Sequence, residues 1–177
     1  MRFFMLATIM VFFILLFGCA QNSAANVKEA IDMKLTSVFK QGEPIPALYT
    51  CDGKDTSPPL KISDVPKDAK SLALIVDDPD APAGTWVHWV VYDIPQETRE
   101  IPEGAKIGLE GMTDFGKLGY GGPCPPDGWH TYRFKLYALD KMLDLKEGET
   151  NAQLEKAMEG HVIAQAELDG EYIRIRT

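Results

Sequence analysis

Histidines and carboxylates are the side chains of this 177-residue chain with the clearest chemical potential. Three aspartates closely precede the first of three histidines. The set is Asp77, Asp78, Asp80, His88, His130 and His161. A carboxylate beside an imidazole can fix the histidine tautomer, and a protonated imidazole donates hydrogen bonds to anions. These residue types therefore predict either acid–base chemistry or a small anion-binding site.

A glycine pair and a tyrosine add hydrogen-bond donors to this set. Gly121 and Gly122 offer backbone N–H groups without side-chain cover, and turns of this kind can bind anions. His130 and Tyr132 are two residues apart, so a strand would place both side chains on one face. His88 is expected on the face of Trp86 and Val90 for the same reason. Each histidine has a second interpretation as a hydrogen-bonded structural residue, because spacing does not show that these groups meet.

Two other chemistries are compatible with the same residues. Cys124 is the one credible nucleophile, with His130 or His88 as base and Asp78 as the orienting group, which would make the protein a hydrolase. No serine lies in a G-x-S-x-G motif. Alternatively, Asp78, His88 and His130 could hold a metal ion, although these ligands are few and loosely spaced. The chain has no phosphate loop of the Walker type, no paired CxxC and no HExxH.

The elements that must position these residues are mostly strands. Apolar, aromatic and β-branched runs with a period of two predict strands over residues 33–39, 71–77, 86–94, 131–139 and 163–176. The last run contains Asp169-Gly170, which predicts either a two-residue hairpin turn or a bend within one strand. Proline-rich segments between the runs must be loops or edges. One helix is expected, capped by Thr150 or Asn151 and ended by Gly160. This pattern predicts a mainly β fold, an antiparallel two-sheet β-sandwich with long ordered loops and one short helix near the C-terminus.

Composition supports one packed domain and argues against nucleic-acid binding. Hydrophobic residues make up 45% of the chain and charged residues 25%, which is typical of a globular protein. Eighteen Lys and Arg stand against 26 Asp and Glu, giving a formal charge of -8. An acidic chain of this kind is a poor candidate for binding nucleic acid.

The N-terminus resembles an export signal. Arg2 precedes an apolar run over residues 3–17 that only Thr8 interrupts, and the run is short for a membrane span. It ends at Gly18-Cys19, which resembles the lipobox of bacterial lipoproteins. We therefore expect residues 1–18 to be removed, Cys19 to carry lipid and anchor the protein in the bacterial envelope, and residues 19–32 to form a tether. An uncleaved membrane anchor is the alternative. The folded domain is expected over residues 33–177.

Export changes the interpretation of the two remaining cysteines. An oxidising compartment favours a disulfide, and Cys51 and Cys124 are the minimum number for one bridge. Two separate thiols are the alternative. The bridge would remove the Cys124 nucleophile, so thiol titration separates the hydrolase from a non-catalytic protein.

Three motifs occur in an order that resembles the phosphatidylethanolamine-binding protein family, in particular its bacterial Raf kinase inhibitor-like branch. The motifs are Asp77-Asp-Pro-Asp-Ala-Pro82, Trp86-x-His88-Trp89, and Gly119-Tyr-Gly-Gly-Pro-Cys-Pro-Pro126 followed by His130-x-Tyr132. Shorter segments, Cys51-Asp-Gly53 with Ser57-Pro58 and Gly160-His-Val162, resemble that branch as well. The resemblance covers about residues 33–172.

The resemblance implies an antiparallel two-sheet sandwich with a small cavity for phosphate-like groups, including phospholipid headgroups. Carried over by motif, the ligand-binding residues would be Asp78, His88, Gly122, Pro123, His130 and Tyr132. We expect a non-catalytic binding or inhibitor module without a cofactor. Family members have been linked to kinase or protease control, but no residue here specifies such a partner.

The charges of these residues suggest how an anion would be held. Asp78 would be an acceptor that fixes a histidine tautomer or a ligand OH or NH group. His88, His130, the Tyr132 hydroxyl and the Gly122 amide would be donors. Binding should strengthen in mildly acid solution, because histidine has a reference pKa near 6.5.

Three departures from the family pattern bear on this site. Thr131 stands where the family usually has arginine, Cys124 stands where larger members have proline, and the chain stops at Thr177 without their further helix. The cysteine and the difference at the C-terminus lead us to expect a cavity that is more open or differently gated than in larger members.

Overall fold

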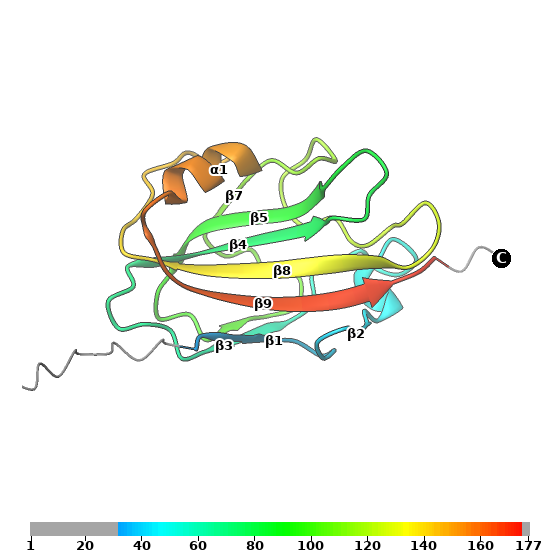
Figure 1. Cartoon of the computed structure of the whole chain (residues 1–177), viewed down its shortest axis with the longest axis horizontal. Coiled ribbons are helices and arrows are strands. Elements are labelled where there is room, and N and C mark those ends of the chain that lie inside the picture. The colour runs from blue at the N-terminus through cyan, green and yellow to red at the C-terminus, as the bar shows by residue number, and fades with distance from the viewer. Residues whose placement is uncertain (1–31, 175–177) are drawn as a thin grey trace, which may run out of the picture.

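Two β-sheets face each other in the computed structural model, which describes residues 32–174 (Figure 1). The small sheet has the order β1-β3-β6 and the large sheet the order β2-β9-β8-β4-β5-β7. The strands are β1 (Lys34–Thr36), β2 (Glu43–Pro44), β3 (Leu60–Ser63), β4 (Ser71–Asp78), β5 (Trp86–Pro95), β6 (Glu100–Ile101), β7 (Leu109–Glu110), β8 (His130–Leu139) and β9 (Val162–Tyr172). A short 3₁₀ helix, η1 (Ala47–Tyr49), and one α-helix, α1 (Asn151–Met158), complete the fold. The predictions for residues 1–18, Cys19 and most of the tether lie outside the described residues.

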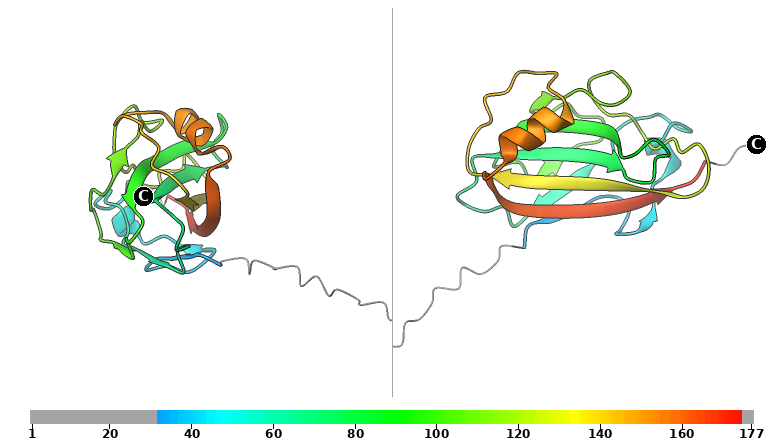
Figure 2. Two further views of the ribbon diagram at one scale, coloured as in Figure 1. Left: turned by 90° about the vertical axis from the view of Figure 1, so that its left-hand side faces the viewer. Right: turned by 45° about the horizontal axis from the view of Figure 1, so that its top comes forward.

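The central strands are buried on both faces, as their continuous apolar runs predict. All eight residues of β4 are buried. One core cluster lies between the sheets and contains Leu74 and Trp89. A second lies on the outer face of the large sheet and contains Ile75 and Val90. This second cluster includes Leu154 and Met158 of α1, and Figure 2 shows the helix lying across that face.

Strand β8 alternates strictly, because only one of its faces meets the core between the sheets. Its inward residues are Tyr132, Phe134, Leu136 and Ala138, all fully buried. On the other face, Arg133 Nε donates to Asp77 Oδ1 at 2.8 Å and Lys135 Nζ to Asp77 Oδ2 at 2.5 Å. Asp77 therefore belongs to an ion-paired cluster on the outer face rather than to a group of acids around a site.

The helix begins where its cap predicts. Thr150 and Gln153 form a capping box, in which each side chain accepts a hydrogen bond from the other residue's backbone N–H. Gly160, with φ of 74°, follows the helix and allows the chain to turn into β9. No helix among residues 32–174 is long and apolar enough to cross a membrane.

The sequence-based expectations differ from the structure in three places. Strand β1 is shorter than residues 33–39, and the sandwich is not purely antiparallel, because β2 pairs with β9 in parallel. Strand β9 runs unbroken through Asp169-Gly170, so the hairpin alternative is wrong. A Cβ on Gly170 would lie 2.5 Å from an Ile45 side-chain carbon and 2.7 Å from a Phe39 ring carbon. The glycine therefore serves close packing rather than a turn.

Candidate functional site

A cavity of about 380 Å³ lies at one end of the large sheet, where β4 ends and β5 and β8 begin. Antiparallel pairing of β4 with both neighbours brings these three strand ends together. The polar side chains of the lining are Asp78, His88 and Tyr132. The rest of the lining is mainly apolar: Ala81, Pro82, Ala83, Trp86, Phe115, Cys124, Pro125 and Pro126. Three of the six predicted ligand-binding residues therefore share one cavity.

His88 is placed by a β-bulge. Val76 pairs with Trp89 and Asp77 pairs with Val87, so His88 is the extra residue of β5 at this point. Val87 packs into the same outer cluster as Val90, which means that the alternation of faces breaks at His88. The expectation that His88 simply shares the face of Val90 is therefore wrong. A strict period of two cannot anticipate an inserted residue.

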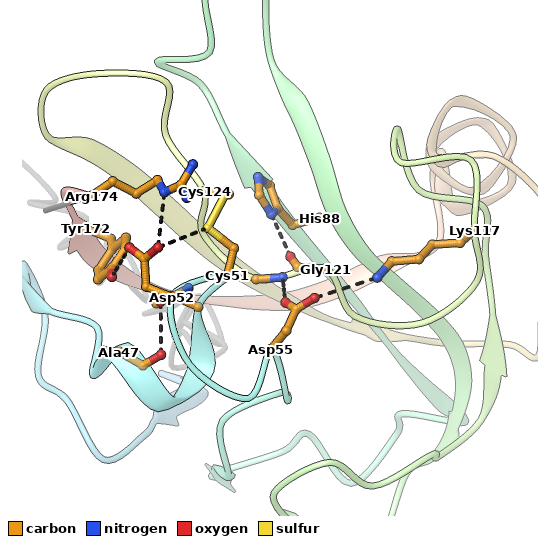
Figure 3. Close-up of a disulfide and its surroundings, with 12 residues drawn as sticks. Ala47, Cys51, Asp52, Asp55, His88, Lys117, Gly121, Cys124, Tyr172 and Arg174 are labelled. Atoms are coloured by element: carbon orange, nitrogen blue, oxygen red, sulfur yellow. Dashed lines mark hydrogen bonds and ion pairs between the residues drawn. A yellow bond between two sulfur atoms is a disulfide. The ribbon is translucent and has the colours of Figure 1, made fainter. Parts of the chain in front are cut away.

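The Gly121 backbone forms hydrogen bonds with both the backbone and the ring of His88. Gly121 N donates to His88 O at 2.9 Å, and His88 Nδ1 lies 2.6 Å from Gly121 O (Figure 3). A carbonyl only accepts hydrogen bonds, so Nδ1 carries the proton and Nε2 of the neutral ring is an acceptor. Burial lowers the pKa of His88 below 6.5, although the Gly121 carbonyl and nearby aspartates oppose this shift. The Nε2 atom of His88 becomes a donor only when the ring is protonated.

His130 lies behind the cavity wall. Its Nδ1 is 2.7 Å from Asp78 Oδ2, and both side chains are almost completely buried. Asp78 Oδ1 accepts a hydrogen bond from Asp80 N at 2.9 Å. Asp78 thus fixes the tautomer of a histidine, as expected, but His130 is not among the residues that line the cavity. Its expected role as a direct donor is replaced by a role in orienting Asp78.

Tyr132 brings a buried polar group to the cavity. The residue is fully buried, and its hydroxyl makes no hydrogen bond of good geometry within residues 32–174, although the Asp78 carboxylate and the Cys124 backbone lie close to it. Burial and the adjacent Asp78 carboxylate raise the pKa of Tyr132 well above its ordinary value, so the hydroxyl keeps its proton. The ring packs edge to face against His88 at 5.1 Å between centroids. A buried hydroxyl of this kind is normally satisfied by water or a ligand.

Gly122 and Pro123 do not line the cavity. The Gly122 amide donates to Asp55 Oδ1 at 2.5 Å, so it is not free to bind an anion as expected (Figure 3). A Cβ on Gly122 would lie 2.6 Å from Tyr49 O and 2.6 Å from Asp55 Oδ1, which explains why glycine is needed here. Pro123 O accepts a hydrogen bond from Cys51 N at 3.1 Å. Both residues fix the loop instead of facing the cavity.

The cysteine of the cavity wall is joined to the neighbouring segment. Cys51 and Cys124 form a disulfide with a Cα–Cα distance of 5.4 Å (Figure 3). While this bond is intact Cys124 has no thiolate, so the proposed hydrolase lacks its nucleophile. Asp52 secures the same segment by accepting hydrogen bonds from Tyr172 Oη at 2.8 Å and Arg174 Nε at 3.1 Å.

Other expected or overlooked groups are placed as follows. His161 lies outside the cavity lining, where its Nδ1 is 2.9 Å from Asp140 Oδ1. Within the described part of the chain, no three or more His, Cys, Asp or Glu side chains are grouped so that they could hold a metal ion.

The apolar wall is the feature that sequence reasoning missed. Its prolines were visible as loop residues, but nothing in their spacing shows that they meet Phe115 across the cavity.

Comparison with known proteins identifies the family of this fold. The family model described as phosphatidylethanolamine-binding protein matches residues 35–173. The chain belongs to the phosphatidylethanolamine-binding protein family. The matched residues include every residue of the cavity and all of the sandwich except Lys34.

Family relatives with similar sequences or structures come from archaea and bacteria. The UPF0098 protein PH1269 of Pyrococcus horikoshii is 52% identical over 158 residues, which cover 83% of this chain and 79% of the relative. A solved homologue from Chlamydia trachomatis, CT736, has a TM-score of 0.79 and 49% identity, covering 81% of this chain and 98% of the other. The E. coli protein YbcL has a TM-score of 0.75 and 34% identity, with coverage of 81% and 99%.

Proposed function

We propose that this protein is a non-catalytic binding module whose cavity holds a phosphate-like group or a phospholipid headgroup. The observation that carries the proposal is the buried hydroxyl of Tyr132, which makes no hydrogen bond of good geometry to the described residues, in a cavity that it shares with Asp78 and His88. A ligand oxygen would supply the missing partner. The family's name gives independent support for ligands of this class.

The lining specifies how such a ligand would be held. The Tyr132 hydroxyl and protonated His88 donate to phosphoryl oxygens, while Asp78 accepts from a ligand OH or NH group. The lining contains no lysine or arginine, so a fully ionised phosphate would meet an uncompensated carboxylate. A ligand that carries its own ammonium group or acidic proton suits Asp78 better. The apolar wall can contact the aliphatic part of a headgroup.

We further propose that a lipid on Cys19 tethers this module to the bacterial envelope. The support is the sequence of the N-terminus, with a short apolar run ending at Gly18-Cys19. The disulfide suits an exported domain, because such bonds persist in oxidising compartments. A tether would hold the cavity close to phospholipid headgroups.

An NMR titration of the purified protein tests the binding proposal. Sodium phosphate and glycerophosphoethanolamine are added separately at pH 6, and chemical shifts of His88 and Tyr132 are followed. We expect weak, saturable shifts at these residues with at least one probe, because so small a ligand buries little surface. His88→Ala should abolish binding in a folded protein, and His161→Gln is the matched histidine control. Shifts that cluster elsewhere, or binding that survives His88→Ala, would contradict the proposal.

A further inference from the structure

A second cavity, of about 210 Å³, lies beside the segment that carries Gly121 and Gly122. Its lining includes Asp55, Ser57, Trp89, Lys106, Glu110 and Tyr120, none of which lines the first cavity. A water molecule occupies about 30 Å³ in the liquid, so the space holds several waters or one small organic molecule. The loop at Gly121 and Gly122 is hydrogen-bonded to a residue of each cavity. Asp55 accepts a hydrogen bond from the Gly122 amide, and the adjoining Gly121 carbonyl accepts one from the His88 ring.

Trp89 lines this cavity and has a buried indole N–H without a hydrogen bond. The side chain is 1% exposed, and its indole N–H has no hydrogen-bond partner among residues 32–174. Its ring packs edge to face against Tyr120, with centroids 5.6 Å apart. An indole N–H is only a donor, so the missing partner must be an acceptor atom. A ligand oxygen at the inner end of the cavity would provide it.

The carboxylates on the cavity wall need hydrogen-bond donors, whereas the indole N–H needs an acceptor. Glu110 is 13% exposed and its Oε2 lies 3.5 Å from Lys106 Nζ. Asp55 Oδ2 forms a long ion pair with Lys117 Nζ, at 3.9 Å. Both carboxylates retain lone pairs that can accept hydrogen bonds from a ligand. Ser57, which is 3% exposed, adds a hydroxyl residue that is almost completely buried.

The combination excludes the simplest ligand classes. An anion would be repelled by two carboxylates, and a cation would leave the indole donor without a partner and would lie near Lys106. A hydroxyl group is both donor and acceptor, so a ligand with several hydroxyls can satisfy Trp89, Asp55 and Glu110 together. The rings of Trp89 and Tyr120 offer apolar surface for the carbon skeleton of such a ligand.

We propose that this cavity is a second binding site, for a small neutral polyhydroxy compound of the size of glycerol or a single sugar ring. The indole N–H of Trp89 donates to one hydroxyl oxygen, and the carboxylates of Asp55 and Glu110 accept from neighbouring hydroxyls. Ser57 supplies a further hydrogen-bonding hydroxyl. This site is independent of the phosphate-like ligand proposed for the first cavity, because the two linings share no residue.

The indole N–H signals make the proposal directly testable. The protein has three tryptophans, and therefore three indole cross-peaks in a ¹H–¹⁵N spectrum. The Trp89 peak is identified by its loss in Trp89→Phe or, if that variant does not fold, by its contacts with the Tyr120 ring. Glucose and glycerol are titrated into the purified protein, with glycine, ethylammonium and sodium phosphate as comparison probes. We expect the Trp89 peak to move with glucose or glycerol and to remain unchanged with the comparison probes.

Two substitutions sharpen the result. Ser57→Ala should raise the apparent Kd of the polyol about fivefold, the effect of one neutral hydrogen bond. Trp129→Phe is the matched aromatic control, because Trp129 does not line this cavity, and it should leave the Kd unchanged. An unmoved Trp89 peak at high millimolar glucose and glycerol overturns the proposal. A peak that moves with glycine, ethylammonium or phosphate but not with a polyol overturns the assigned ligand class. Since the His88 signals report the first cavity separately, failure at one site is distinguishable from failure at the other.

Discussion

His130 Nδ1 lies 2.7 Å from Asp78 Oδ2, and both side chains are almost completely buried, Asp78 in the lining of the first cavity and His130 behind it. This hydrogen bond orients the carboxylate of that cavity. A hydrogen bond to a charged group contributes about 1.5–3 kcal/mol. We therefore expect Asp78→Asn, which keeps the size of the side chain but removes its charge, to lower the free energy of unfolding by about that amount. Urea denaturation measures the loss, and the ¹⁵N shifts of the His130 ring report its altered tautomer. An unchanged tautomer and midpoint would contradict this role for Asp78.

Stability should depend on pH through His88. Burial lowers its pKa in the folded protein, so below pH 6.5 the unfolded chain binds more protons at this residue than the folded one. The His88 contribution to the free energy of unfolding should therefore be fully present above pH 6.5, fall as the pH is lowered toward the folded-state pKa, and then level off. Comparing the unfolding of wild type and His88→Gln across this range isolates the contribution, and an identical pH profile for both would exclude it.

Ligand affinity should depend on pH in the opposite direction to stability. Only protonated His88 donates through Nε2, so the affinity for a phosphodiester should increase as the pH falls from 8 through 6.5 and below. Glycerophosphoethanolamine is the suitable probe, because its phosphodiester charge does not change in this range. NMR titrations at several pH values measure the trend. Affinity that rises with pH would show that His88 is not an anion donor.

Tyr132→Phe should weaken phosphodiester binding without unfolding the protein. The hydroxyl makes no hydrogen bond of good geometry to the described residues, and a hydrogen bond to a charged phosphoryl oxygen accounts for about 1.5–3 kcal/mol of binding free energy. His161→Gln serves as the control, since His161 forms only a part-exposed pair with Asp140, which contributes at most about 1 kcal/mol to stability. Equal affinities for wild type and Tyr132→Phe would remove Tyr132 from the binding site.

The Cys51–Cys124 disulfide should stabilise the fold and the cavity together. It closes a loop between residues 73 positions apart, for which the chain-entropy model gives about 4 kcal/mol. Replacing both cysteines with serine should lower the free energy of unfolding by up to that amount. It should also weaken phosphodiester binding, because the wall at Cys124 and Pro125 is then joined to the turn after η1 only by weaker contacts such as the hydrogen bond from Cys51 N to Pro123 O. Two free thiols in denatured protein taken from the envelope under non-reducing conditions would instead revive the Cys124 nucleophile.

Lipidation of Cys19 is a separate prediction from the sequence. Metabolic labelling with a fatty-acid analogue should mark the protein, and Cys19→Ser should abolish the label and retain residues 1–18. Mass spectrometry of the purified protein measures both effects. A wild-type protein that keeps residues 1–18 in the membrane would support the uncleaved anchor.

The sequence alone determined the β-sandwich, the helix cap and the three polar residues of the cavity lining. These features depend on local patterns: the period-two alternation of β8, the Thr150 cap, and motifs that place Asp78, His88 and Tyr132 at strand ends. Tertiary structure decided the rest. The bulge at His88 depends on pairing with Val76 and Asp77, and Gly122 lost its expected role because Asp55, distant in sequence, takes its N–H. The long β9 continues through Asp169-Gly170 because it pairs with β8 there, and Phe39 and Ile45, from another part of the chain, pack so closely that only glycine fits. Such contacts join residues far apart in sequence, so no local pattern encodes them.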